Sequence, residues 1–344
     1  YAHIISSMQN VTASQVRHIA SRESETLDAE FLKLETSAFA DKTQTPSAEA
    51  LAQQFDRYKA DVPGEATEAN PFGFGYRLPS RVQFDYIALK LSDVAAIIKQ
   101  PTDEDAELYY QQNRARQFTE KAPANPNDPN SPQIDRVKSY IEVADEIMAQ
   151  LRRQRIVTRA EQILQEARSV ADLNLPRAVD GNEPTVAQRK AKAGDYAKIA
   201  QDLSVRHSIP LYNGTTGLLS AADIRADRYL RRMYLTNYGY NPAPLPMVLF
   251  SAKEFGKDAT VLQTSSAAQL FTSIGPAKDP MSASAPDVSG QIMLIARLVA
   301  AEPDAAPASL DASFSTHTLN LGDPSDQKDK LFSVKEKVVK DLQT

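Results

Sequence analysis

Apolar residues recur at every second position at the start of the stretch 81–116. Val82, Phe84, Tyr86 and Ala88 lie on one face of this segment, which is rich in residues that favour strands. The alternation stops before a proline, where an extended segment commonly ends. The pattern therefore predicts a strand as the first part of this stretch.

The pattern changes to that of a helix after Pro101. Thr102 is a suitable N-cap, and Asp105 stands three residues later, where the acid of a capping box belongs. Residues 103–105 are all acidic, which suits the positive N-terminal end of a helix. The stretch 81–116 therefore predicts a strand followed by a helix that starts just after a proline.

The same order of features occurs once earlier in the chain. Residues 31–59 align with residues 86–114 without a gap. The matched pairs are a strand aromatic, a turn proline, a hydroxyl cap, a first-turn acid and a helix aromatic: Phe31/Tyr86, Pro46/Pro101, Ser47/Thr102, Glu49/Glu104 and Phe55/Tyr110. We interpret them as two copies of one unit. The alternative is chance, because extended segments followed by acid-capped helices are common.

A long amphipathic helix is predicted over residues 137–170, after a proline-rich and asparagine-rich linker at 121–133. At about 1.5 Å per residue it would be roughly 50 Å long, which suits an elongated frame. Further along, residues 195–205 predict a short helix and residues 290–299 a strand. We expect an α+β chain, mainly α, with a helical module at 1–175, a smaller α+β domain at 190–303, and a linker with the start of a helix at 304–344.

Composition excludes some functions. The chain has 344 residues, a net charge of −5 and no cysteine, so disulfides, thiol catalysis and thiolate metal sites are excluded. The charge gives no reason to expect nucleic acid. The lack of cysteine fits an oxidising compartment. Because the chain begins at Tyr1 and stops within a helical pattern, we expect a fragment, with any membrane segment outside it.

Catalytic motifs are absent from the sequence. The four histidines are far apart, and none belongs to a recognised metal-binding or hydrolase motif. His207 is the one histidine considered for catalysis; the other interpretation is that it ends a helix, where it interacts favourably with the helix dipole. We expect no metal and no cofactor, and a function in binding.

Two parts of the chain carry a pattern in common with a known group of proteins. The first part starts a helix with the residues Pro101, Thr102, Asp103, Glu104, Tyr109, Tyr110, Asn113 and Phe118. The second part returns in a later helix with Lys138, Tyr140, Val143, Asp145, Glu146, Ile147, Leu151, Arg152 and Arg153. Together they resemble the periplasmic folding factors of the SurA and PpiD group, which are parvulin-type peptidyl-prolyl isomerases with a helical chaperone module. The resemblance implies a location in the cell envelope and an anchor in the inner membrane outside this chain.

Residues 194–205, 213–220 and 289–303 are similar to a helix, a glycine-rich turn and the closing strand of the parvulin domain in this family. The opening strand expected from the family is missing, and the histidine of its closing strand aligns with Ile292. The resemblance therefore implies a degenerate parvulin-like domain with little or no isomerase activity.

The expected function is binding of unfolded or extended polypeptides without ATP. The candidate contacts are aromatic residues, although large aromatic side chains belong to a core more often than to a contact site. They are Phe72, Phe74, Tyr76, Tyr109, Tyr110 and Phe118. One rival is an active prolyl isomerase that uses His207. Another is a structural subunit of an envelope complex.

Overall fold

A computed structural model describes residues 46–125, 131–179, 181–235, 242–256, 267–283, 287–323, 326 and 330–343. These residues form both helices and antiparallel strands, which confirms the α+β class at this coarse level. The strand of the first repeat copy lies outside the described residues. The helix of that copy is described: α4 (Ala48–Tyr58) begins at Ser47, whose hydroxyl accepts a hydrogen bond from the Ala50 amide.

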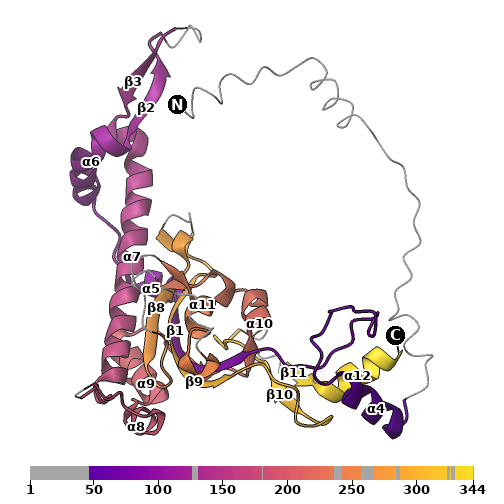
Figure 1. Cartoon of the computed structure of the whole chain (residues 1–344). Coiled ribbons are helices and arrows are strands. Elements are labelled where there is room, and N and C mark those ends of the chain that lie inside the picture. Colours follow the sequence, from indigo (N-terminus) through magenta and orange to yellow (C-terminus); the bar gives the residue numbers. More distant parts are fainter. Residues whose placement is uncertain are drawn as a thin grey trace, which may run out of the picture.

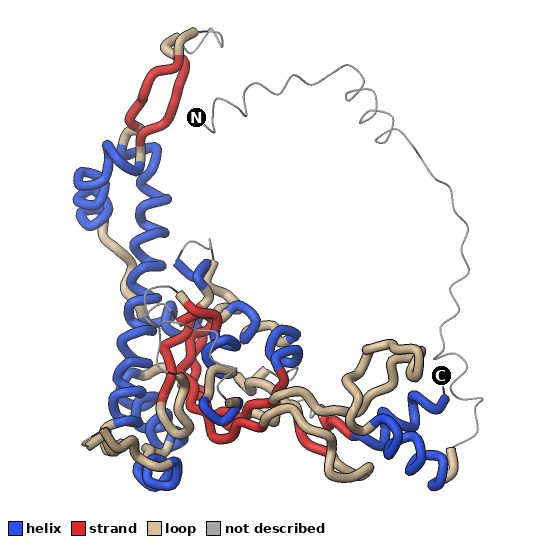
Figure 2. Tube along the Cα trace, in the orientation of Figure 1, coloured by secondary structure: helices blue, strands red, loops and turns tan. Residues whose placement is uncertain are grey.

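An antiparallel sheet forms the centre of the molecule (Figures 1 and 2). Its strand order is β4-β1-β9-β8-β6-β7, and β5 also pairs with β1. The strands are β1 (Arg81–Lys90), β4 (Tyr212–Thr215), β5 (Leu219–Ser220), β6 (Tyr234–Leu235), β7 (Ala243–Pro244), β8 (Ser273–Lys278) and β9 (Ile292–Glu302). The longest pairing joins β1 to β9, from Arg81 opposite Glu302 to Lys90 opposite Ile292.

Both faces of this sheet are buried. Ile87 and Leu89 of β1 and Ile295 of β9 face α5 (Leu91–Ile97), α7 (Tyr140–Asp172) and α9 (Tyr196–His207). Phe84 and Leu294 belong to the core on the other face, which is covered by shorter elements: α10 (Ala221–Ala226), the 3₁₀ helix η1 (Leu230–Arg232), α11 (Leu245–Leu249) and the 3₁₀ helix η2 (Lys253–Phe255). Burial on both faces explains why β9 reads as a nearly continuous apolar run.

An arm extends away from the sheet along the first half of α7 (Figure 1). It also contains α6 (Asp103–Gln117) and a hairpin of β2 (Thr119–Pro123) and β3 (Gln133–Val137). The predicted capping box of α6 is confirmed, because Thr102 and Asp105 exchange hydrogen bonds.

Two expectations for the arm were wrong. Residues 119–123 and 133–137 pair as strands rather than forming an irregular linker, and the long helix begins at Tyr140, not at residue 137. The physical reason is the capping box of Ser139 and Glu142, which starts the helix just after β3 ends.

A second projection joins the beginning and the end of the described chain. Here α4 packs against α12 (Val334–Gln343), beside the loop 60–80 and the strand pair β10 (Ser313–Ser315) and β11 (Leu331–Ser333). The C-terminal segment 304–344, expected to be a linker and a helix start, therefore takes part in a small core. The helix itself is where the sequence predicted it.

The structure differs from the predicted division at residues 175–190. β1, from the first predicted domain, lies between β4 and β9 of the second. Long-range strand pairing, which no local pattern reveals, joins the two parts into one sheet.

Candidate functional site

The aromatic residues of the loop 60–80 pack in the cluster formed by α4 and α12. Tyr76 is 2% exposed, and its ring is stacked on the ring of Phe55. The ring of Phe74 lies edge-on to the ring of Tyr58. Phe72 is different, because its ring is stacked on Phe74 but remains 80% exposed. Two of these three candidate contacts therefore serve the local core.

The other three aromatic candidates lie in the arm. Tyr110 and Phe118 are buried against α7, and the Tyr110 hydroxyl donates to the Lys138 carbonyl at 2.7 Å. The Tyr109 hydroxyl donates to Gln117 and accepts from Gln150. Because α6 and α4 lie at opposite ends of the molecule (Figure 1), the six predicted aromatics do not form one site.

His207 ends α9 and holds it against α7. Its Nε2 lies 2.9 Å from the Glu166 carboxylate and its Nδ1 lies 3.0 Å from the Arg159 guanidinium. Arg206 also donates to Glu166. Desolvation raises the pKa of Glu166, but the hydrogen bonds from His207 and Arg206 outweigh it and leave the pKa below its usual value. Both ring nitrogens therefore have partners within the protein.

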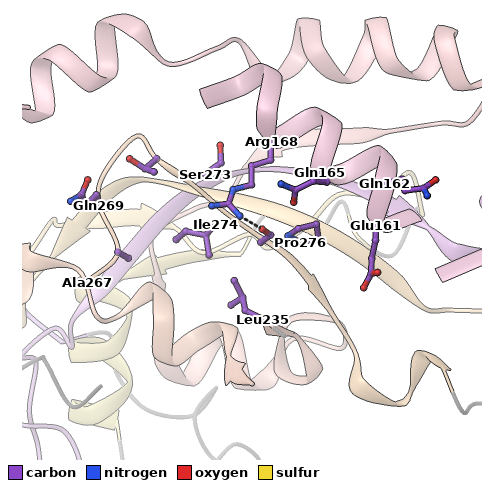
Figure 3. A pocket seen from close by; sticks show the side chains of 13 residues that line it. Glu161, Gln162, Gln165, Arg168, Leu235, Ala267, Gln269, Ser273, Ile274 and Pro276 are labelled. Carbon is purple, nitrogen blue, oxygen red and sulfur yellow. Dashed lines mark hydrogen bonds between the residues drawn. The ribbon is translucent and has the colours of Figure 1, made fainter. Parts of the chain in front are cut away.

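A cavity of about 810 Å³ lies between α7 and β8 (Figure 3). We call it the α7–β8 cavity. One wall is a face of α7, and the other is the segment that leads into and through β8. It is lined by Glu161, Gln162, Gln165, Arg168, Leu235, Ala267, Ala268, Gln269, Thr272, Ser273, Ile274, Gly275 and Pro276. The volume is that of a typical ligand pocket.

The β8 wall has its shape because the strand is irregular there. The register of β8 against β9 shifts between Ile274 and Ala277. Gly275, in the middle of the shift, has a φ of +117°, a conformation that favours glycine. The shift turns the Gly275 carbonyl toward α7, where it accepts a hydrogen bond of 2.7 Å from Arg168 (Figure 3).

The charged groups around the cavity are already paired within the protein. Glu161 forms an ion pair with Lys278, and Arg168 is held by the Gly275 carbonyl and lies 4.0 Å from Asp172. Asp172 also accepts a hydrogen bond of 2.7 Å from the Ser273 hydroxyl. The cavity therefore presents little uncompensated charge.

The Ser273 hydroxyl is held from two sides. It donates to Asp172 and accepts from the Tyr196 hydroxyl at 2.9 Å. Burial raises the pKa of Tyr196 above its ordinary value, so this phenol stays a proton donor. The chain of hydrogen bonds joins α7, α9 and β8, and it fixes the wall of the cavity.

Amide side chains supply the remaining polar groups. Gln162, Gln165 and Gln269 line the cavity, and among the described residues their side-chain amides have no hydrogen-bond partner. An amide offers both donors and an acceptor, as a peptide group does. With Leu235, Ile274 and other small apolar residues beside them, these amides can hold an uncharged polar chain.

The sequence indicated none of this cavity. Its walls come from residues 161–168 and 267–276, which are about a hundred positions apart, and each segment alone looks like an ordinary surface. One feature of the sequence could have indicated the α7 wall. Three polar residues that line the cavity recur at a spacing of three and so share a face of the helix: Gln162, Gln165 and Arg168.

Comparisons with known proteins gave no match to a family model, to a curated protein or to a solved structure. Within the described ranges, no three potential metal ligands gather into a group that could hold an ion. In the same ranges, no helix combines the length and the apolar character needed to cross a membrane.

Proposed function

We propose that this protein binds extended polypeptide segments without ATP, in the manner of a chaperone, and that the α7–β8 cavity holds part of the segment. The observation that carries the proposal is the division of polar groups in the cavity. The charges are paired internally, whereas the three glutamine amides have no hydrogen-bond partner among the described residues and can bond a peptide backbone. A peptide chain supplies the matching donors and acceptors at each residue.

The resemblance to the SurA and PpiD group supports the same function. The arm contains the residues that carry the resemblance, from Pro101 in front of α6 to Arg153 in α7. We propose accordingly that the protein works in the cell envelope, anchored by a segment outside this chain. The rival function of a prolyl isomerase centred on His207 has less support, because both ring nitrogens bond α7 and the α7–β8 cavity is not lined by it.

The test is peptide binding measured by fluorescence anisotropy with a labelled, uncharged eight-residue peptide. Gln162→Ala combined with Gln165→Ala removes two neutral hydrogen bonds and should weaken binding about tenfold. Ala267→Trp, which fills the cavity, should weaken binding at least as much. The matched control is Gln111→Ala with Gln112→Ala, two exposed glutamines of α6, which should leave the affinity unchanged.

Thermal unfolding of each variant checks that the fold is intact. Equal affinity in the wild type and in both cavity variants would contradict the proposal. A proline-peptide turnover assay tests the rival: clear activity that disappears in His207→Ala would favour the isomerase. Lack of binding together with a fixed partner in pull-downs would favour a structural subunit.

A further inference from the structure

A second cavity, of about 550 Å³, gathers three arginines in a chain whose net charge is −5. We call it the arginine cavity. One wall is η1 with the residues beside it. The other wall is made by residues 279–281 and 289–292. It is lined by Arg228, Tyr229, Arg231, Arg232, Met233, Tyr234, Asp279, Pro280, Met281, Ser289, Gly290, Gln291 and Ile292.

Positive charge in the arginine cavity is poorly compensated. Asp279 is the single acid among the described residues of its lining, and its carboxylate already accepts a hydrogen bond of 2.9 Å from the Met281 amide. Arg231 and Arg232 are exposed, and neither guanidinium has an ion-pair or hydrogen-bond partner among the described residues. Two guanidinium groups are therefore available for an anionic ligand.

The third arginine shows what this row binds. Arg228 pairs with Asp323 at 3.3 Å and with Asp326 at 2.6 Å. Both acids belong to this same chain, where the Asp326 amide donates to the Asp323 carbonyl at 2.8 Å and the Asp326 carboxylate accepts from the Leu321 amide at 3.1 Å. One end of the arginine row is thus occupied by two carboxylates of a polypeptide.

The rest of the cavity suits a ligand with apolar side chains. Met233 and Ile292 are buried in its wall, and the Met281 side chain is 62% exposed at its edge. The Arg228 guanidinium lies over the Tyr229 ring at 4.6 Å, which fixes the planes of both groups. Asp227 holds the start of η1 by accepting from the amides of Tyr229 and Leu230.

We propose that the arginine cavity binds an acidic, extended polypeptide segment whose carboxylates pair with Arg231 and Arg232. This deepens the proposed function, on which it rests, by naming a class of client that carries acids beside apolar residues. A nucleic acid fits less well, because it needs a longer basic track than three arginines, and Asp279 interrupts this one.

The experiment compares two labelled peptides of eight residues, one alternating glutamate with leucine and one alternating glutamine with leucine. The wild type should bind the glutamate peptide about tenfold more tightly at low salt, and the difference should shrink as salt rises. Arg231→Gln combined with Arg232→Gln should remove the preference. Arg114→Gln combined with Arg116→Gln, which removes the same charge from α6, should keep it.

Two results would overturn the inference. One is an equal preference for the glutamate peptide in the wild type and in the Arg231 and Arg232 variant. The other is an oligouridylate of equal charge that competes as well as the glutamate peptide, which would indicate a phosphate site. If the glutamine peptide binds at the α7–β8 cavity and the glutamate peptide binds no better, this inference fails while the proposed function stands. If neither peptide binds, both fail.

Discussion

Single polar residues that suggest chemistry serve here to join elements. His207 connects α9 to α7, and Ser273 connects β8 to α7 and α9. Each of these side chains has its hydrogen-bonding groups occupied by neighbours in the protein. A buried polar group with satisfied partners fixes the arrangement of the elements that carry it. At this scale both side chains act as links between secondary-structure elements.

The link through His207 can be removed by His207→Ala. The substitution breaks two side-chain hydrogen bonds and leaves Glu166 with Arg206 alone, so the free energy of unfolding should fall by about 1 kcal/mol. Urea denaturation followed by circular dichroism measures the change. Affinity for the uncharged peptide should stay the same, and a tenfold loss of affinity without a change in stability would contradict this role.

Glu142 links stability to pH. Hydrogen bonds from Arg136, and then from the amide and hydroxyl of Ser139, lower its pKa from 4.5 to about 2. A pKa that is lower in the folded state stabilises the fold above the unfolded value and loses that effect as pH falls. The wild type should therefore have a higher free energy of unfolding than Glu142→Gln at neutral pH. This difference should disappear as the pH falls from about 4.5 to about 2.

Denaturation of both proteins across this pH range gives the difference directly. Glu146→Gln is the control, because it removes an equal charge from the same helix. The Glu146 side chain is exposed and has no hydrogen-bond partner among the described residues. A stability difference for Glu142→Gln that does not change with pH would show that this carboxylate makes no special contribution.

At the scale of elements, local signals predicted much of the fold. Thr102 with Asp105 gave the start of α6, and the apolar spacing of residues 195–205 gave α9. The hairpin β2–β3 was missed because it lies in a stretch rich in proline and asparagine, and its β3 residues are all exposed. Without burial there is no alternation of apolar and polar residues to read.

Packing between α6 and α7 holds the arm together, and Ile147 lies fully buried in that cluster. Ile147→Ala leaves a cavity there, and such changes cost about 2–5 kcal/mol. Because the cluster is small, we expect faster amide hydrogen exchange in α6 with little change in the central sheet. Ile141→Ala, on the same helix but 89% exposed, should alter exchange in neither region. Equal effects of both substitutions would contradict the assignment of the arm core.

At the scale of the whole molecule, the pairings that define the fold could not be predicted from the sequence. Arg81 and Glu302 are 221 positions apart, yet they pair across β1 and β9 and form an ion pair of 2.6 Å. The two walls of the α7–β8 cavity are likewise brought together by the sheet. Local periodicity predicts elements but carries no information on which strands will meet, so the boundary between the two predicted domains was placed where the fold has none.

The central position of β1 gives a direct test of this architecture. A protease site inserted between Gly181 and Asn182 would divide the chain into halves of which neither contains the complete sheet. Because β1 lies between β4 and β9, and α7 packs on α9, the cut halves should stay together on size-exclusion chromatography. They should also unfold in one transition near that of the uncut protein carrying the same insertion. Separation into two halves that each unfold cooperatively would show two independent domains, and it would also remove the basis for a cavity built from both.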